Sequence, residues 1–533
     1  MGSKKSLLWL PILIIFTLAI GFLIGNYYSD KPVNWKNKID VILNVIEQEY
    51  IDTVDINSLI EEAIPNIVSE LDPHSVYIPA EDLESVNEGL DGHFSGIGVQ
   101  FVLQKDTIIV ISILSGGPSE KTGLQAGDRI VTINDSLFTG PNINNEKVMK
   151  NLRGPKGSVV KVGIKRGTSE TLLDYEITRG DVPLTSIDVA YQVKPGIGFI
   201  KLGKFGRTTY NEVIVAMIKL TQEGCESFII DLRGNPGGIL EAAIAIVNEF
   251  LPRGRLIVYT EGKASPRNDA IADGTGTYQK QALVILIDEW SASASEIVAG
   301  AIQDNDRGTI VGRRSFGKGL VQNQIQLSDN SALRLTVARY YTPSGRSIQK
   351  KYELGKSNEY EKDLTIRFKQ GEFDSADSIK LEDNLQYTTR IGRTVYGGGG
   401  IMPDIFIPRD TAGSSSYYST LFNQGIIYDY AFQYADRHRD LKIQYKNYKS
   451  FLSYLQDQPV LHEVIDFAES KKIRRRPTLI EISKKQIENL AYAYIVRNLF
   501  GDEGFYSILH ASDPTVKKAI EIIQEGKTFP EKE

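Results

Sequence analysis

The sequence predicts a multidomain α/β protein, and three features of its 533 residues indicate this. Strand-like and helix-like segments alternate over residues 183–410, which is typical of a sheet covered by helices. A β-rich module precedes this core at 91–182, and helical patterns occupy 34–90 and 413–533. Because the chain is much longer than one ordinary domain, we expect several folding units.

Residues 1–30 predict a short cytoplasmic stub and a transmembrane anchor. Lys4 and Lys5 precede an uncharged apolar stretch at 7–25, which is just long enough to span a bilayer. The two lysines should stay cytoplasmic, so the rest of the chain should lie outside. A cleaved signal peptide is the competing interpretation, although GFLIGNYYSD lacks a good small-residue cleavage site.

The next two regions are predicted from their periodicity. In 34–90, WKNKIDVILNVIEQEY and DINSLIEEAIPNIVSEL place apolar residues at three- and four-residue steps, as helices do. In 91–182, GIGVQFVLQKDTIIVISIL predicts two strands around a polar turn. NINNEKVMKNL predicts a short amphipathic helix, and SVVKVGIKRG and TLLDYEITRG predict half-buried strands.

The core at 183–410 is predicted from alternating segments. IGFIKLGKF, SFIIDLRG, ALVILID and GTIVG are typical of strands, and TYNEVIVAMIKLTQ, ILEAAIAIVNEFL and SEIVAGAIQDN of helices. A polar, charged interruption at about 351–395 predicts a surface insertion. Residues 413–533 predict a C-terminal helical extension, in which no catalytic pattern occurs.

Composition excludes several classes of function. The net charge of −6 and pI of about 5.7 argue against a nucleic-acid-binding protein, which normally carries a basic face. The five histidines form no metal-type pair such as HExxH, so we expect neither a metal nor another cofactor. The single cysteine, Cys225, precedes a strand-like run and is interpreted as a small buried residue.

The stretch SASASEIVAGAIQDN has two interpretations. Ser293 precedes a helical pattern and Glu296 follows three residues later, which together predict a capping box. A helix N-terminus is also a good place for a nucleophilic serine, because free backbone N–H groups such as that of Ala294 face developing negative charge.

Lys318 lies between two glycines in RSFGKGLVQ. A solvated surface lysine is the default interpretation. If the side chain points inward, however, desolvation lowers its pKa, and a neutral amine can take a proton from a serine hydroxyl. No histidine occurs in this region, and serine–lysine pairs are a known alternative to serine–histidine pairs.

The segment DLRGNPGG at 231–238 follows one apolar run and precedes a helical pattern. A tight strand-to-helix turn explains its glycines and proline. Its free N–H groups could instead cradle a phosphate or form one side of an oxyanion hole, with the Ala294 N–H as the other side.

Taken together, the motifs resemble the carboxyl-terminal processing proteases of serine peptidase family S41, the tail-specific proteases. The resemblance covers about 36–350 and resumes at 397–408. It is carried, in order, by ELDPHSVYIP, GHFSGIGVQF, GPSEKTGLQAGDRIVTIND, LRGPKGSVVKVGIKR, DLRGNPGG, SASASEIVAGAIQD, GRRSFGKGLVQ and YYTPSGRSIQ. Each motif alone is weak, and the ordered combination is specific.

The resemblance implies a crotonase-like α/β protease core with an inserted PDZ domain. It implies that Ser293 is the nucleophile, that Lys318 is the base and that Gln322 orients the lysine. The oxyanion hole would use the Ala294 N–H together with that of Gly237 or Gly238.

The β-rich module resembles a PDZ domain, which binds an extended peptide as an added strand. The implied peptide-binding residues are Gly96, Ile97, Gly98, Val99, Val148 and Leu152. The implied partners are proteins or peptides with unstructured C-termini, and self-association into a homo-oligomer is a further expectation. The implied location is a bacterial inner membrane, with the catalytic domains in the periplasm.

Two other functions stay open at this point. A membrane-anchored PDZ scaffold with an inert core would need only a misaligned serine and lysine. A crotonase-like acyl-thioester enzyme shares oxyanion loops of this kind. The PDZ module and Lys318 argue against the second function, because neither helps to bind coenzyme A.

Overall fold

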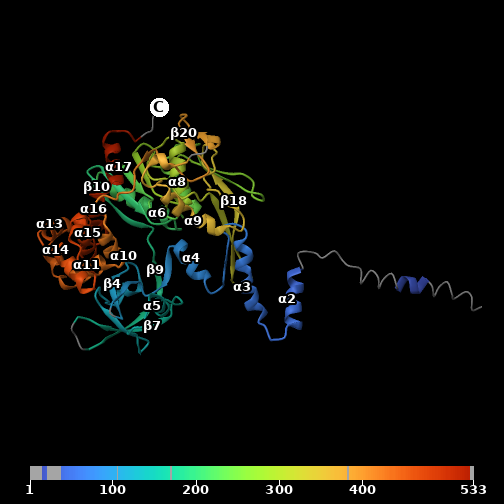
Figure 1. Cartoon of the computed structure of the whole chain (residues 1–533), viewed down its shortest axis with the longest axis horizontal. Coiled ribbons are helices and arrows are strands. Elements are labelled where there is room, and N and C mark those ends of the chain that lie inside the picture. The colour runs from blue at the N-terminus through green and yellow to red at the C-terminus, as the bar shows by residue number, and fades with distance from the viewer. Residues whose placement is uncertain (1–14, 21–37, 105, 168–170, 381–382, 529–533) are drawn as a thin grey trace, which may run out of the picture. The chain divides into compact units, whose positions relative to one another are not determined.

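The computed structural model describes residues 15–20, 38–104, 106–167, 171–380 and 383–528 (Figure 1). The chain divides into two compact units, residues 1–68 and 69–533. The first unit contains α2 (Lys38–Glu49) and nearly all of α3 (Ile56–Ser69), at the positions where the sequence predicts helices.

The predicted anchor at 7–25 lies mostly outside the described residues. Residues 15–20, which belong to it, are helical. Within the part of the chain that the structure describes, no helix combines the length and the apolar character needed to cross a bilayer. The anchor therefore stays a prediction.

A six-stranded sheet forms the predicted α/β core. Its order is β10 (Ile187–Lys194), β11 (Ile197–Leu202), β12 (Ser227–Asp231), β15 (Ala282–Ile287), β16 (Thr309–Gly312) and β21 (Ile405–Phe406). All neighbours are parallel except β10 and β11. Side chains alternate between the two faces, so Phe228 and Ile230 belong to one core cluster and Ile229 to another. The first cluster includes α6 (Thr209–Gln222), α7 (Leu240–Asn248) and α8 (Ala294–Asp304).

The last helix, α17 (Pro514–Gln524), belongs to this core. Its Val516, Ala519 and Ile522 are buried in the same cluster as Ile229 and strand residues of β15. By contrast, the preceding helices build a core of their own. They are α10 (Ser416–Asn423), α11 (Ile426–Arg437), α12 (Leu441–Gln444), α13 (Tyr448–Gln456), α14 (Val460–Ser470), α15 (Pro477–Phe500) and α16 (Asp502–His510). The region after 413 is helical as predicted, but its last helix packs on the α/β core sheet instead of belonging to a separate extension.

The β-rich module has a sheet in the order β3 (Val99–Gln104), β4 (Thr107–Ile113), β5 (Arg129–Ile133), β7 (Val159–Lys165) and β8 (Leu173–Thr178). β2 (His93–Gly96) pairs with β9 (Gly180–Pro183) and so joins the two ends of the module. The predicted helix is α5 (Asn145–Leu152), and the Asn144 side chain caps it. β3 is an edge strand, which leaves one side free to pair with an added peptide strand.

A second sheet supports the region of Lys318. It contains β1 (Val76–Ile78), β18 (Ala332–Tyr341), β13 (Leu256–Glu261) and β14 (Asn268–Ile271), and β17 (Leu320–Gln326) pairs with β18. Lys318 lies just before β17.

The segment 351–395 is more than the surface insertion that its polarity predicts. It contains α9 (Ser357–Lys369), on which Arg367 is buried. The Arg367 guanidinium donates to the Ser315 carbonyl at 3.0 Å and to Glu372 at 3.0 Å. These hydrogen bonds hold the buried Arg367 against the loop that leads to Lys318. The sequence shows that the segment is charged, but it does not show that this arginine is buried.

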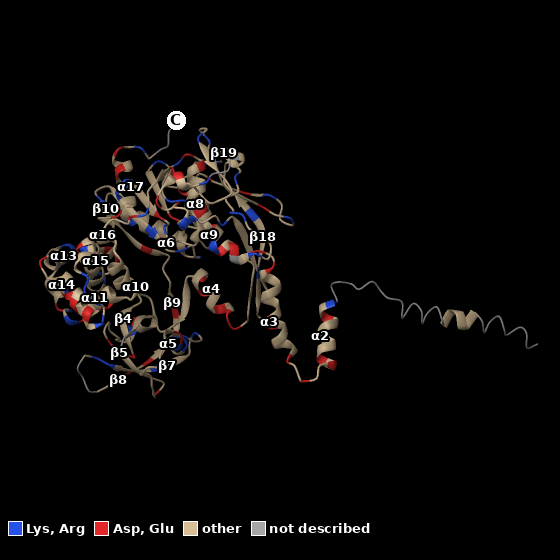
Figure 2. Ribbon diagram, viewed as in Figure 1, with Lys and Arg blue, Asp and Glu red and all other residues tan. Residues whose placement is uncertain are grey.

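Basic and acidic residues are interspersed along the ribbon of the core and of the C-terminal helices (Figure 2). This distribution agrees with the modest net charge of −6.

Candidate active site

Ser293 is the N-cap residue of α8, as the sequence predicts. The capping box is present, and the Ser293 N–H donates to Glu296 Oε2 at 2.9 Å. Ser293 has φ 55° and ψ −113°, a conformation that residues with a side chain rarely adopt. Strain of this kind persists only where neighbouring contacts hold the residue in place, and it concentrates at functional sites.

The two neighbouring serines hold the DLRGNPGG loop against the start of α8. Ser291 Oγ donates to the Leu232 carbonyl at 2.8 Å, and Ser295 Oγ donates to the Asn235 carbonyl at 3.0 Å. The Ala292 N–H reaches the same Asn235 carbonyl at 3.0 Å. The loop and the serine segment therefore form one rigid unit.

Gly237 brings this loop into contact with Ser293. A Cβ added at Gly237 would lie 2.6 Å from the Ala292 carbonyl oxygen and 2.7 Å from Ser293 Cβ. Its φ is +95°, so both the close approach and the backbone conformation require glycine. The two predicted sides of the oxyanion hole thus meet in the fold.

The hydrogen bonds distinguish the two glycine candidates. The Gly237 N–H donates to Asn235 Oδ1 at 2.8 Å and is therefore occupied. Within the described residues, the N–H groups of Gly238 and Ala294 have no acceptor. Free N–H groups are what an oxyanion hole offers to its ligand, so Gly238 is the better partner for Ala294.

Glu296 joins the serine segment to the lysine loop. This fully buried carboxylate accepts a hydrogen bond from the Ser293 N–H and also from three groups of the lysine loop. These are Ser315 Oγ at 2.5 Å, the Gly317 N–H at 2.7 Å and the Lys318 N–H at 2.8 Å. Burial raises the pKa of Glu296 to about 7, although the four donors oppose this shift.

Tyr340 bridges the same two residues from β18. Its buried hydroxyl lies within hydrogen-bond distance of the Ser293 carbonyl, at 3.1 Å, and also contacts the Lys318 carbonyl. Glu296 and Tyr340 therefore fix the backbones of Ser293 and Lys318 relative to each other. We call this arrangement the Glu296–Tyr340 frame.

The surroundings of Lys318 favour a neutral amine. Burial lowers its pKa below the ordinary value, and the charge of Arg334 lowers it further, whereas Glu296 and Asp72 act in the opposite direction. In the described structure the Lys318 amine does not form a hydrogen bond with the Ser293 hydroxyl. Catalytic hydrogen bonds of this kind often tighten only when substrate binds.

Gln322 lies on β17, and the hydrogen bond that its side chain makes is to Thr336. Its Nε2 donates to Thr336 Oγ1 at 3.3 Å, and Thr336 Oγ1 donates to Asp72 Oδ1 at 3.0 Å. Asp72 and His74 both belong to the ELDPHSVYIP motif. His74 Nε2 lies 2.9 Å from the Tyr360 hydroxyl oxygen. The sequence places this motif before the module but does not indicate that it faces the lysine.

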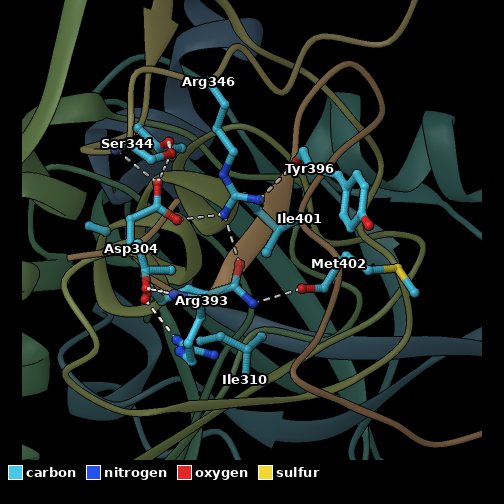
Figure 3. Close-up of polar contacts among 12 residues, drawn as sticks. Asp304, Ile310, Ser344, Arg346, Arg393, Tyr396, Ile401 and Met402 are labelled. Atoms are coloured by element: carbon cyan, nitrogen blue, oxygen red, sulfur yellow. Dashed lines mark hydrogen bonds and ion pairs between the residues drawn. The ribbon is translucent and has the colours of Figure 1, made fainter. Parts of the chain in front are cut away.

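The far end of α8 is held by a buried ionic network (Figure 3). Arg346 donates to Asp304 at 2.7 Å, to Gln303 at 2.8 Å and to the Tyr396 carbonyl at 2.8 Å. Arg393 pairs with Asp306 and Asp404. Cations at a helix C-terminus are also favoured by the helix dipole, so α8 is fixed at the end opposite to Ser293.

The module's candidate binding groove has a cavity of about 90 Å³. Four predicted residues line it: Ile97, Gly98, Val99 and Leu152. Two do not: Val148 is fully buried in the module's own core, and Gly96 belongs to β2 and lies outside the cavity lining. The sequence analysis missed the other lining residues, which are Phe94, Phe101, Met149 and Arg153.

Two further expectations can be compared with the structure. Cys225 is a buried free thiol. Among the described residues, no three His, Cys, Asp or Glu side chains are grouped so as to hold a metal ion.

Three regions of the chain match known family models. Residues 196–359 match the model of peptidase family S41, and residues 95–177 match that of the PDZ domain. Residues 417–501 match a family of unknown function, DUF8443.

Relatives show the same similarity. The chain is 37% identical over 315 residues to a carboxy-terminal-processing protease of Bartonella bacilliformis, covering 58% of this chain and 71% of the relative. It is 33% identical over 317 residues to a probable CtpA-like serine protease of Staphylococcus aureus, covering 59% of this chain and 63% of that protein. A solved photosystem II D1 C-terminal processing protease is 24% identical with a TM-score of 0.37, covering 77% of this chain and 95% of that one.

Proposed function

Since this chain belongs to peptidase family S41 and is a serine-type C-terminal processing peptidase with a PDZ domain, we propose that Ser293 and Lys318 are its catalytic dyad. The observation that supports the dyad best is the Glu296–Tyr340 frame. Two buried side chains contact the backbone of both residues, although the residues come from separate loops. A frame of this kind pre-organises a nucleophile and its base.

The proposed reaction uses few groups. Neutral Lys318 takes the proton of the Ser293 hydroxyl while Ser293 Oγ attacks the scissile carbonyl carbon. The N–H groups of Ala294 and Gly238 stabilise the resulting oxyanion. Lys318 then gives the proton to the leaving amine as the C–N bond breaks, and water hydrolyses the acyl-enzyme.

Gln322 is proposed to orient Lys318 within this reaction. The support is its place at the start of β17, directly after the lysine loop, and its link through Thr336 to Asp72. Asp72 interacts electrostatically with Lys318.

The test of the proposed function is Ser293→Ala in the full-length chain. We expect it to abolish cleavage of an unstructured protein that ends in an apolar tail, while the tail still binds. The exposed Ser470→Ala is the matched control and should retain full turnover. Full activity of Ser293→Ala would refute the dyad. If wild type bound tails but cleaved nothing, the inert PDZ scaffold would be the better interpretation.

The proposed role of the PDZ domain is to capture the C-terminal tail of a substrate. The support is an edge strand, β3, beside an apolar groove that includes Met149 and Leu152 of α5. An extended peptide pairs with such an edge, and the groove accepts its last side chain.

Met149→Glu tests this capture. A carboxylate in the groove should repel the terminal carboxylate of the tail and raise KM for a tailed substrate about tenfold, an unfavourable change of about 1.4 kcal/mol. The kcat for a short peptide without the tail should be unchanged. Asn145→Glu, at an exposed position of the same helix outside the groove lining, adds the same single negative charge and is the control. Equal KM values for both variants would contradict tail capture.

Anchoring of the chain in a bacterial inner membrane, with its catalytic domains in the periplasm, is proposed from Lys4, Lys5 and the apolar stretch at 7–25. Resistance of the full-length chain to alkaline extraction from membranes would test it. Self-association stays a prediction that sedimentation of the purified chain would test.

A further inference from the structure

We propose that Asp513, which precedes the last helix, is a positioning residue for the oxyanion hole. The C-terminal extension would then act in catalysis by holding the DLRGNPGG loop. This proposal rests on the proposed function, because that function assigns the hole to the same loop.

The Asp513 carboxylate makes two different sets of contacts. Its Oδ1 caps α17 by accepting from the N–H groups of Thr515 at 2.8 Å and Val516 at 3.3 Å. Its Oδ2 accepts from Arg233 Nη1 at 2.7 Å. One oxygen therefore stabilises the helix, and the other holds a side chain of the catalytic loop.

Arg233 fixes the stem of that loop. Its guanidinium donates to both carboxylate oxygens of Asp231, at 2.9 and 2.8 Å, and its N–H donates to Asp231 Oδ1 at 2.9 Å. The Arg233 carbonyl accepts from Lys201 Nζ at 2.8 Å. Because Gly238 follows in the same loop, a movement of Arg233 should shift its N–H, which the proposed function assigns to the oxyanion hole.

Asp513 is the second carboxylate that pairs with Arg233, while Lys201 interacts with Asp231 and also with Asp188. Arg233 and Lys201 are cations, and Asp231 and Asp513 are carboxylates. Burial alone would raise the pKa of Asp231, but Arg233 and Lys201 hold it well below its usual range. Without the Asp513 charge, Arg233 would keep only the buried Asp231 as an ion-pair partner and would share it with Lys201, so Arg233 would be drawn towards water.

The nearby His510 does not take over the role of Asp513. His510 ends α16 close to the cluster, and its Nδ1 lies 2.9 Å from the Tyr191 hydroxyl. Burial lowers the pKa of His510 to about 4, so it is neutral at neutral pH. α17 itself is held by burial of Val516, Ala519 and Ile522 on the core sheet, which keeps Asp513 in place.

Asp513→Asn in the full-length chain separates the two contacts. Asparagine caps a helix about as well as aspartate, so the cap is kept, while the charge and the acceptor that faces Arg233 are lost. We expect kcat to fall about tenfold, as a slightly misplaced catalytic group would cause. KM for a tailed substrate should be unchanged. Affinity for a peptide boronic acid, whose tetrahedral adduct places an oxygen in the hole, should fall by a similar factor. Asp513→Glu keeps the charge and should retain more of the kcat.

Asn447→Ala is the control. It removes the N-cap of α13 in the same extension, far along the chain from the loop, and should lower the melting temperature without changing kcat per active site. An Asp513→Asn enzyme with wild-type kcat and boronate affinity would overturn the proposal and leave the dyad standing. A wild-type enzyme without peptidase activity would overturn both the proposed dyad and the proposed role of Asp513.

Discussion

Replacing Lys318 with arginine is expected to abolish turnover, with kcat falling about a thousandfold or more, as loss of a general base does. Arginine keeps the positive charge and a long side chain, but it stays protonated in proteins and cannot accept the Ser293 proton. Steady-state kinetics on a tailed substrate measures the loss. Lys362→Arg, on the exposed surface of α9, makes the same chemical change away from the site and should be neutral. Retained turnover in Lys318→Arg would refute its role as base.

The wild-type pH profile follows from the same residue. Because the pKa of Lys318 is lowered, its neutral fraction grows as the pH rises towards that pKa, so kcat/KM should increase between pH 6 and 9. Deprotonation of Glu296, whose pKa is about 7, completes the frame, but its charge raises the pKa of Lys318 and so moves the increase in activity to higher pH. Burial raises the pKa of Tyr340 well above its ordinary value, so this hydroxyl does not titrate in the range. A flat profile would contradict a lysine base.

The sequence predicts the site well where function depends on residues close together in the chain. The capping box of Ser293 and Glu296 is a local pattern, and the structure confirms it. The second role of Glu296 is different, because its bonds to Ser315, Gly317 and Lys318 join segments that only the sheet brings together. Because the capping box already explains Glu296, the sequence does not indicate that this residue also binds the lysine loop.

The binding groove shows how a small error in helix phase changes an assignment. Val148 and Met149 are neighbours on α5, and successive helical residues point about 100° apart. Val148 enters the module's core, whereas Met149 lines the groove. The apolar pattern predicts an inward face, but it does not distinguish a face buried in a core from one reserved for a ligand.

The role of α17 was missed for another reason. Its apolar stripe predicts an amphipathic helix, and any apolar surface would satisfy that pattern. The strands of the core sheet are apolar throughout because both faces of the sheet are buried. Their sequences therefore do not indicate that a helix from the end of the chain covers one face. Only the contacts between α17 and the core sheet, which are distant in the sequence, show where this helix packs.

Gly237→Ala is expected to lower kcat by about a hundredfold to a thousandfold, as loss of an oxyanion-hole donor does. The new Cβ would lie within 2.8 Å of the Ala294 nitrogen and 2.7 Å of Ser293 Cβ. The loop must therefore move away from α8, and the N–H groups of Ala294 and Gly238 would no longer converge. Because substrate tails bind elsewhere, KM should change little.

Gly224→Ala separates this clash from backbone strain. Gly224 has φ +89°, close to the +95° of Gly237, but a Cβ there meets nothing within 4 Å. Both variants carry the cost of a left-handed alanine, about 1–2 kcal/mol, and should lose similar stability from it. Only Gly237→Ala should also lose kcat and affinity for a peptide boronic acid, measured per folded enzyme. If both variants kept wild-type kcat, the DLRGNPGG loop would not form the oxyanion hole, and Ser293 would need another source of electrostatic stabilisation.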